Sequence, residues 1–103
     1  MSEIDGIRTG ITSSSITVAA NDRYFVDTSG GAKTITLPAS PQVGDQVSLV
    51  DLASTFDTNN LTVGRNGKKI NNATADLVVS TEDSAIGLVF TGDTFGWKLI
   101  EVL

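Results

Sequence analysis

The sequence predicts an all-β protein: an antiparallel β-sandwich of jelly-roll type, with about eight short strands and an extended N-terminal arm. Three observations predict this fold. From Ser14 onward, apolar and polar residues alternate with a period of two. Turn residues such as Gly, Asn, Asp and Pro recur about every 8–12 residues. No segment of the chain makes a convincing amphipathic helix.

The first thirteen residues are polar and carry three spaced isoleucines, Ile4, Ile7 and Ile11. A spacing of three to four residues fits one face of a helix, but Gly6 and Gly10 weaken any helix there. We therefore expect an extended arm that docks its isoleucines on a neighbouring subunit. A frayed terminus is the alternative interpretation, because chain ends are often poorly ordered.

Four strands are expected in the first half of the chain, over residues 15–20, 23–27, 33–37 and 45–52. The clearest of them places Ile35 and Leu37 on one face. Thr34 and Thr36 lie on the opposite face of that strand. Pro38 has no N–H to donate to a neighbouring strand, so we expect the strand to stop there.

Further short strands are expected in the second half, over residues 61–65, 68–70, 77–80, 85–91 and 96–102. Asn66-Gly67 is a strong signal for a type I′ turn, which needs a positive φ at both central positions. Phe56 lies in the loop before these strands and is expected at an edge of the core. Phe90 and Trp97 are expected at the centre of the core, as neighbours in a hairpin, because they carry large apolar areas.

The length of the chain fits one domain, because 103 residues leave little room for two hydrophobic cores. We expect the arm to occupy residues 1–13 and a single β-sandwich domain to occupy residues 14–103. Two sheets packed face to face are favoured because each strand has one apolar face. Burial of one Val or Leu side chain is worth roughly 1.5–3 kcal/mol.

The composition argues against strongly charged partners. Charged residues make up only 18% of the chain, and the net charge is -5. Nucleic-acid binding needs clustered Lys and Arg, and the one basic cluster (Arg65, Lys68 and Lys69) lies in a turn. The absence of basic arms argues against anionic membranes, and residues 1–20 lack the pattern of a signal peptide. We therefore expect neither a nucleic-acid partner nor a membrane partner.

The chain lacks the residue types on which much catalysis and metal binding depend. It contains no His and no Cys, which removes the commonest general base, the commonest metal ligand and every thiolate. Asp76, Glu82 and Asp83 are close in sequence, but they flank turns, where carboxylates are simply solvated. Loop aspartates could hold calcium, but no Asp-x-Asp-x-Asp ladder is present. We expect no enzyme activity, no catalytic residue, no cofactor and no metal.

Several blocks of sequence between residues 22 and 100 resemble a β module of tailed-bacteriophage virion proteins. The blocks are Tyr24-Phe25-Val26-Asp27-Thr28, KTITLPASP from Lys33, Gly44-Asp45, NNLTVGRNG from Asn59, and Gly96-Trp97-Lys98-Leu99-Ile100. The order of the blocks is fairly specific, whereas each block alone is not. The resemblance implies a compact jelly-roll β-sandwich, usually trimeric, that serves as an assembly or adhesion part.

A short chain with an N-terminal arm resembles, among such proteins, a capsid decoration (cement) protein. We expect a homotrimer that binds the major capsid protein at the outer surface of the virion and stabilises the shell. Such a protein is made in the host cytoplasm. Ile4, Ile7 and Ile11 are the expected protein-interface residues. Deletion of residues 1–12 is expected to weaken particle binding without unfolding the domain.

The alternative is a tail-fibre tip, knob or other tail-attached protein that binds the host surface and has a tail protein as its partner. Recognition of a cell-surface sugar needs exposed aromatic side chains beside polar loop residues. Phe56, Phe95 and Asn59-Asn60 are the candidates, although core packing also explains the aromatic residues. The two hypotheses differ in copy number: hundreds per virion for a decoration protein, and a few to dozens for a tail protein.

Overall fold

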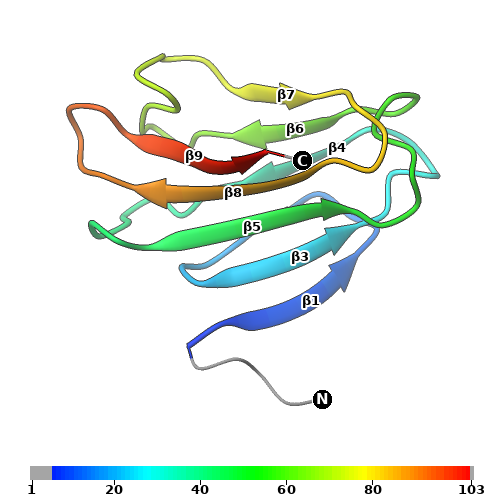
Figure 1. The fold of residues 1–103 in the computed structure, drawn as a ribbon, viewed down its shortest axis with the longest axis horizontal. Helices are drawn as coiled ribbons and strands as arrows, with labels where there is room; N and C mark the ends of the chain where they lie inside the picture. The colour runs from blue at the N-terminus through cyan, green and yellow to red at the C-terminus, as the bar shows by residue number, and fades with distance from the viewer. Residues whose placement is uncertain (1–5, 103) are drawn as a thin grey trace.

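The computed structural model describes residues 6–102, and this part of the chain folds into strands and turns without a helix (Figure 1). The strands are β1 (Arg8–Thr12), β2 (Ile16–Thr17), β3 (Asp22–Val26), β4 (Lys33–Thr36), β5 (Gln46–Asp51), β6 (Leu61–Gly64), β7 (Leu77–Val79), β8 (Ala85–Phe90) and β9 (Trp97–Val102). The prediction of an all-β protein is confirmed. None of the described residues belongs to a helix with the length and apolar character that crossing a membrane requires.

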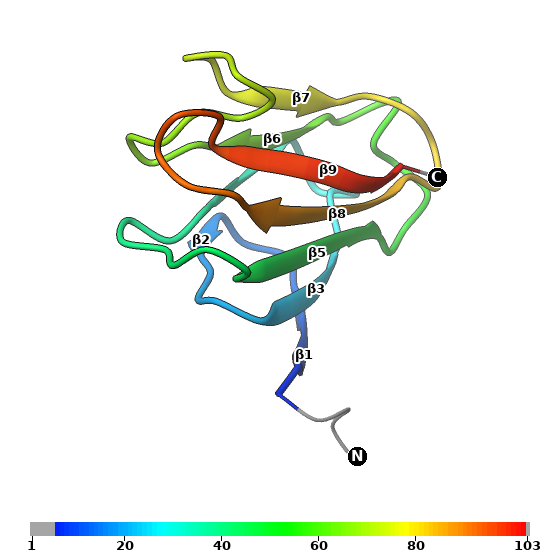
Figure 2. The same ribbon diagram turned by 60° about the vertical axis from the view of Figure 1, so that its left-hand side comes forward.

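The strands form two mixed sheets. Sheet A has five strands in the order β1-β3-β5-β8-β9, and sheet B has four in the order β2-β4-β6-β7. From β1 to β6 the chain alternates between the sheets, so each strand pairs in parallel with the next strand but one (Figures 1 and 2). Each turn of this winding adds one strand to each sheet, as in a short β-solenoid. After β6 the chain reverses, and β7, β8 and β9 are added by antiparallel pairing.

The prediction of an antiparallel jelly-roll is wrong for the part of each sheet that the first six strands build, where every pairing is parallel. Side chains alternate with a period of two in both parallel and antiparallel strands, so the alternation does not distinguish them. Short connections between the strands favour hairpins. Here, however, the strand that lies between two parallel neighbours belongs to the other sheet and serves as their crossover connection.

The two sheets share one hydrophobic core. Its buried members are Val18, Val26, Ile35, Leu37, Val47, Leu49, Phe56, Leu61, Val63, Ile70, Val79, Ile86, Leu88, Phe90 and Trp97. Phe90 and Trp97 are paired on β8 and β9, with ring centroids 5.3 Å apart and ring planes inclined by 58°. Such tilted aromatic pairs attract beyond the area that they bury. The predicted burial of Phe56, Phe90 and Trp97 is therefore confirmed.

The turn at Asn66-Gly67 forms as predicted. Its φ angles are 51° and 87°, and the N–H of Lys68 donates to the carbonyl of Arg65 over 3.2 Å. Positive φ at both central residues is the property of a type I′ turn. The side-chain amide of Asn66 also donates to the carbonyl of Leu37 at 2.9 Å, which fixes the turn against the end of β4.

The short strand predicted over residues 68–70 does not return along β6, and the segment packs instead against the start of β9. The N–H of Trp97 donates to the carbonyl of Lys69 at 2.8 Å, and the N–H of Asn71 donates to the carbonyl of Trp97 at 2.8 Å. Gly96 makes this close approach feasible. Its φ is 79°, and a Cβ atom at this position would collide with the carbonyl group of Lys69.

The segment predicted to be an N-terminal arm includes a strand of sheet A. Strand β1 pairs in parallel with β3 over its full length, from Arg8 opposite Asp22 to Thr12 opposite Val26. This pairing makes β1 the first edge strand of the sheet. The deletion of residues 1–12 would remove this edge strand, so it does not test the arm alone.

Candidate functional site

The structure places the three predicted interface isoleucines differently. Ile4 lies outside the described residues. Ile7 precedes β1 and is half-buried. Ile11 lies within β1 and leaves 71% of its surface exposed. Of the two of these isoleucines that the structure describes, Ile11 is therefore the one whose apolar side chain is available to a partner.

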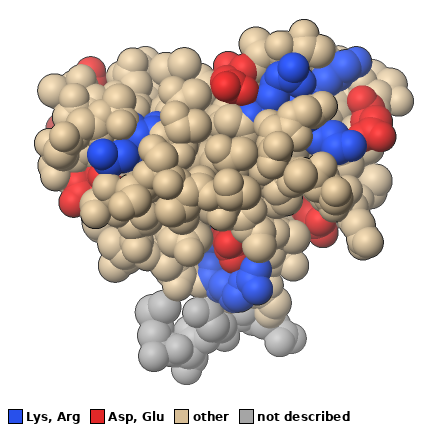
Figure 3. Space-filling view, turned by 180° about the vertical axis from the view of Figure 1, so that it is seen from behind, with Lys and Arg blue, Asp and Glu red and all other residues tan. Residues whose placement is uncertain are grey.

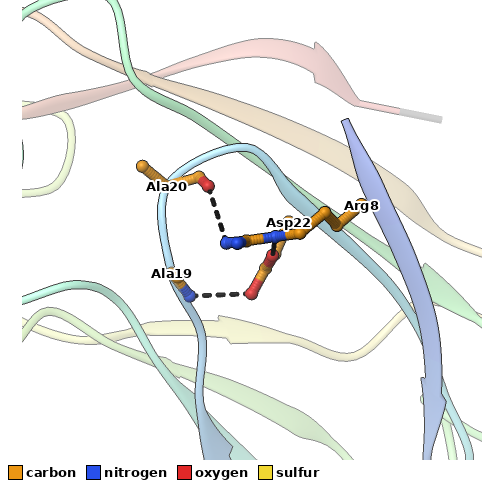
Figure 4. A network of polar contacts seen from close by, with 4 residues as sticks. All are labelled: Arg8, Ala19, Ala20 and Asp22. Carbon is orange, nitrogen blue, oxygen red and sulfur yellow. Dashed lines mark hydrogen bonds and ion pairs between the residues drawn. The ribbon is translucent and has the colours of Figure 1, made fainter. Parts of the chain in front are cut away.

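A small polar network fastens β1 to the turn before β3 (Figure 4). Arg8 Nε donates to Asp22 Oδ1 at 2.9 Å, and Arg8 Nη2 donates to the carbonyl of Ala20 at 3.3 Å. The other carboxylate oxygen of Asp22 accepts the N–H of Ala19 at 2.8 Å. The Arg8 side chain is largely exposed, so this ion pair contributes little free energy. Its effect is to fix where β1, and with it Ile11, lies along β3.

Ile11 belongs to a row of apolar residues on the outer face of sheet A. The register places Ile11 beside Phe25, Phe25 beside Val50, and Val50 beside Ala85. Paired residues on neighbouring strands point to the same side of a sheet. The neighbouring row on the inner side passes through the buried residue Leu49, so the row that begins at Ile11 points away from the core.

Ile100 extends this apolar surface from the other edge strand of the sheet. A bulge opposite Gly87 and Leu88 inserts one extra residue into β9. As a result, the side chain of Ile100 lies directly over Gly87, which leaves room for it because it has no side chain. Ile100 leaves 60% of its surface exposed. We call Ile100 and the four residues of the row together the outer stripe.

The sequence alone does not reveal the outer stripe. Alternation places Phe25 and Tyr24 on opposite faces of one strand, but it does not show which face is inside. It also gives no information on which residues of different strands lie side by side. The five members of the outer stripe come from five strands, so only the register of sheet A brings them together. The single signal in the sequence was Ile11.

A polar cluster lies at the end of the fold where β5 ends. It is built around the buried carboxylate of Asp51. Asp51 accepts three backbone N–H groups: from Thr55 at 3.1 Å, from Phe56 at 3.0 Å and from Asp83 at 3.0 Å. Asp83 also accepts a hydrogen bond from the hydroxyl of Ser54. Asp51 therefore ties the loop after β5 to the turn before β8, and its oxygens are occupied by this structural task.

The proposed sugar-binding residues are not brought together. Phe56 is fully buried in the core, and the side-chain amide of Asn59 donates to the carbonyl of Thr28 at 2.8 Å. Phe95 lies in the turn between β8 and β9 and leaves 53% of its surface exposed. The loop from β5 to β6 and the turn from β8 to β9 lie at opposite ends of the fold (Figure 1). One exposed aromatic residue therefore remains from the predicted set.

Basic side chains gather around the turn that carries Phe95, at the upper right of Figure 3. Each is held by an internal contact: Lys68 Nζ lies 2.9 Å from Asp93 Oδ1, Lys69 Nζ donates to the carbonyl of Thr94 at 3.1 Å, and Lys98 Nζ donates to Asn72 Oδ1 at 2.6 Å. Among the described residues, no group of three or more acidic, His or Cys side chains is placed to hold a metal ion.

A groove of about 180 Å³ lies where β7 and β9, the last strands of the two sheets, border one another. Its lining residues are Leu77, Val78, Val79, Ser80, Thr81, Ser84, Ile86, Leu99 and Val102. Aliphatic side chains predominate, and three hydroxyl groups lie among them.

Asp27 provides a test of the local structure by its titration. The hydroxyl and the N–H of Ser29 hydrogen-bond to its carboxylate, the N–H at 2.8 Å, and Lys33 adds attraction, so the pKa of Asp27 is lowered from its ordinary value of 3.8. Because the folded pKa is lowered, this contribution to stability is complete above the ordinary pKa and is lost as the pH falls through the lowered value. We expect the carboxyl carbon of Asp27 to titrate in NMR spectra below pH 3.8.

Substitution Ser29→Ala is expected to move that titration upward, because it removes the hydroxyl that stabilises the carboxylate. A midpoint for Asp27 at or above its ordinary pKa would show that the hydrogen bonds to Ser29 do not form in solution.

Comparison of the chain with models of known protein families and with curated proteins found no match.

Proposed function

We propose that the chain is a structural protein of a tailed-bacteriophage particle: a homotrimeric decoration protein that binds the outer capsid surface and stabilises the shell. In this proposal the two mixed sheets form a β-sandwich that acts by contact rather than by catalysis. The blocks of sequence that resemble the phage β module support the phage assignment. The observation that carries the role in assembly is the outer stripe, which presents exposed Ile11 and Ile100 on the solvent side of sheet A, outside the buried core.

An exposed apolar surface of this kind has a cost for a protein that stays alone in water. Removal of apolar surface from water is worth roughly 25 cal/mol per Å². Contiguous exposed apolar surface therefore marks a place where a partner binds. The outer stripe lies on paired strands, and a preformed surface of this kind loses little conformational entropy when it binds.

A second candidate function, host-surface binding by a tail-attached protein, is favoured by one observation. Phe95 is an exposed aromatic side chain in a turn that is held by hydrogen bonds from Asn72 to Phe95 and from Gly96 to Gly92. The exposed ring could stack on a sugar, while Lys69, whose Nζ donates to the carbonyl of the neighbouring Thr94, binds polar groups of the sugar.

The copy number in the virion tests both functions. We expect quantitative mass spectrometry of purified particles, from the phage whose genome encodes the chain, to find hundreds of copies per particle. We also expect electron microscopy with an antibody to the chain to label the capsid. A few to dozens of copies, with label on the tail, would replace the decoration role by the second candidate. Absence of the chain from purified particles would contradict both.

A further inference from the structure

We infer that the outer face of sheet A is the surface through which copies of this chain bind one another, with the outer stripe at its centre. This inference rests on the proposed function, because it identifies the self-association surface of a protein proposed to be an oligomer. It goes beyond that function by assigning the outer stripe to the contacts between copies of the chain.

The residues of the outer stripe do not belong to the core of the single chain. Neither the buried core nor the partly buried residues packed against it include any of the five. Ile11 and Ile100, at the two edges of sheet A, are 71% and 60% exposed. Phe25 and Val50, on the strands between them, are half-buried. The stripe therefore crosses the whole width of the sheet on its solvent side.

The outer face of sheet B shows what this protein presents to water when a face has no apolar partner. Its outward residues include Thr17, Thr34, Thr36 and Thr62, which the register places side by side on β2, β4 and β6. The one large apolar residue among them is Val78 on β7, which is paired with Thr62. A threonine face is easily hydrated. Threonine and the aliphatic residues both favour strands, so strand propensity does not explain why the outer face of sheet A is apolar where that of sheet B is hydroxylic.

Charge favours a second copy as the occupant. The chain carries a net charge of -5. On the outer face of sheet A, however, the register and alternation place only Arg23, Lys98 and Glu101 among its charged residues. The Arg23 guanidinium already donates to the hydroxyl of Thr9 at 3.0 Å. Copies of the chain can therefore meet through this face without bringing most of their acidic charges together, since Glu101 is the one acidic residue among these three.

The size of the face is consistent with an interface between copies. Five strands at roughly 4.8 Å each, with about five residues at 3.3 Å along each strand, give a flat face of roughly 400 Å². A stable interface of standard size buries about 800 Å² on each partner. The flat sheet thus supplies about half of that area. Protruding side chains and the flanking loops add further accessible area that this flat value omits.

Substitution of the two most exposed members of the stripe tests this inference. We expect the wild-type chain to show a mass of several times 10.8 kDa in sedimentation equilibrium. The double variant Ile11→Ser/Ile100→Ser should raise the dissociation constant by about a hundredfold or more, because two apolar contacts per chain are lost. Both side chains are exposed in the single chain. The circular dichroism spectrum and the melting temperature of the variant should therefore equal those of the wild-type chain measured at a concentration where it is dissociated.

Two matched controls lie on other surfaces. Val78→Ser changes an apolar residue that is 54% exposed on sheet B, and Val43→Ser changes one that is 73% exposed between β4 and β5. Both variants should associate like the wild type. An assembly that survives Ile11→Ser/Ile100→Ser, or one that Val78→Ser or Val43→Ser dissociates, would overturn the inference. A wild-type chain that is monomeric at millimolar concentration would overturn it as well.

The proposed function is judged separately, by the presence of the chain in purified particles. A chain that is abundant on capsids but assembles without the outer stripe would retain the proposed function and lose this inference. A chain that assembles through the stripe but is absent from particles would do the reverse.

Discussion

Substitution Trp97→Ala should lower the free energy of unfolding by about 3–5 kcal/mol, the usual cost of removing a large aromatic side chain from a core. Trp97 is fully buried, and its ring packs against Phe90 with 5.3 Å between centroids. Its backbone joins Lys69 and Asn71 to the start of β9. The substitution therefore leaves a cavity at the point where the antiparallel strands meet the loop after β6. A domain of this size has roughly 5–15 kcal/mol of stability in all.

The measurement is urea denaturation followed by far-ultraviolet circular dichroism, because the variant loses the single tryptophan of the chain. Trp97→Phe is the matched control. It keeps an aromatic ring against Phe90, and the indole nitrogen has no hydrogen-bond partner among the described residues, so the control should cost distinctly less. A loss below about 1 kcal/mol for Trp97→Ala would show that the core is not centred on this pair.

Substitution Asp51→Ala is the second large effect that we expect, a loss of about 3 kcal/mol or more. The carboxylate accepts the N–H groups of Thr55, Phe56 and Asp83, and Asp51 is buried. Each buried donor left without an acceptor costs about 1–3 kcal/mol. Thr55 and Phe56 belong to the loop after β5, and Asp83 belongs to the turn before β8. The loop and the turn should therefore loosen together.

Asp51→Asn separates the hydrogen bonds from the volume of the side chain, because an amide keeps one oxygen and replaces the other by a group that cannot accept. We expect an intermediate loss and faster hydrogen exchange at the amides of Phe56 and Asp83. Asp57→Ala, at an exposed position of the same loop, should change stability by less than about 0.5 kcal/mol. Equal effects for the Asp51 and Asp57 substitutions would contradict the structural role of Asp51.

Local features of this fold could be predicted from the sequence because they depend on neighbouring residues. Alternation identified Ile35 and Leu37 as inward-facing, and both are buried. The Asn66-Gly67 pair gave the correct turn, since only a few residue types tolerate positive φ. The hairpin that joins Phe90 to Trp97 has a short turn, so its two strands meet as predicted.

The winding of the first six strands could not be predicted in this way. A strand such as β3 has the same alternation whether its neighbour is parallel or antiparallel, and its partners β1 and β5 are separated from it by a strand of the other sheet. Strand β1 was predicted as an arm because its isoleucines are spaced at three and four residues and two glycines interrupt them. Gly10 has a specific task there: the ring of Tyr24 occupies the space that a larger side chain would need.

The candidate site shows the same division between local and long-range information. The prediction that Ile11 is an interface residue depends only on its place among spaced isoleucines in a polar segment. Phe25, Val50 and Ala85 read as ordinary strand residues, and they become a surface only when the register aligns them with Ile11. Ile100 joins them through a bulge, which strand alternation does not indicate.

The most direct test of the account is a methyl NMR spectrum of the wild-type chain recorded over a range of concentrations, since it changes no residue. As the copies associate, the methyl signals of Ile11, Val50 and Ile100 should shift together. The signals of Val78 on sheet B and of buried Ile35 should stay in place. Shifts centred on Val78, or a spectrum that does not depend on concentration, would contradict the claim that this protein assembles through the outer face of sheet A.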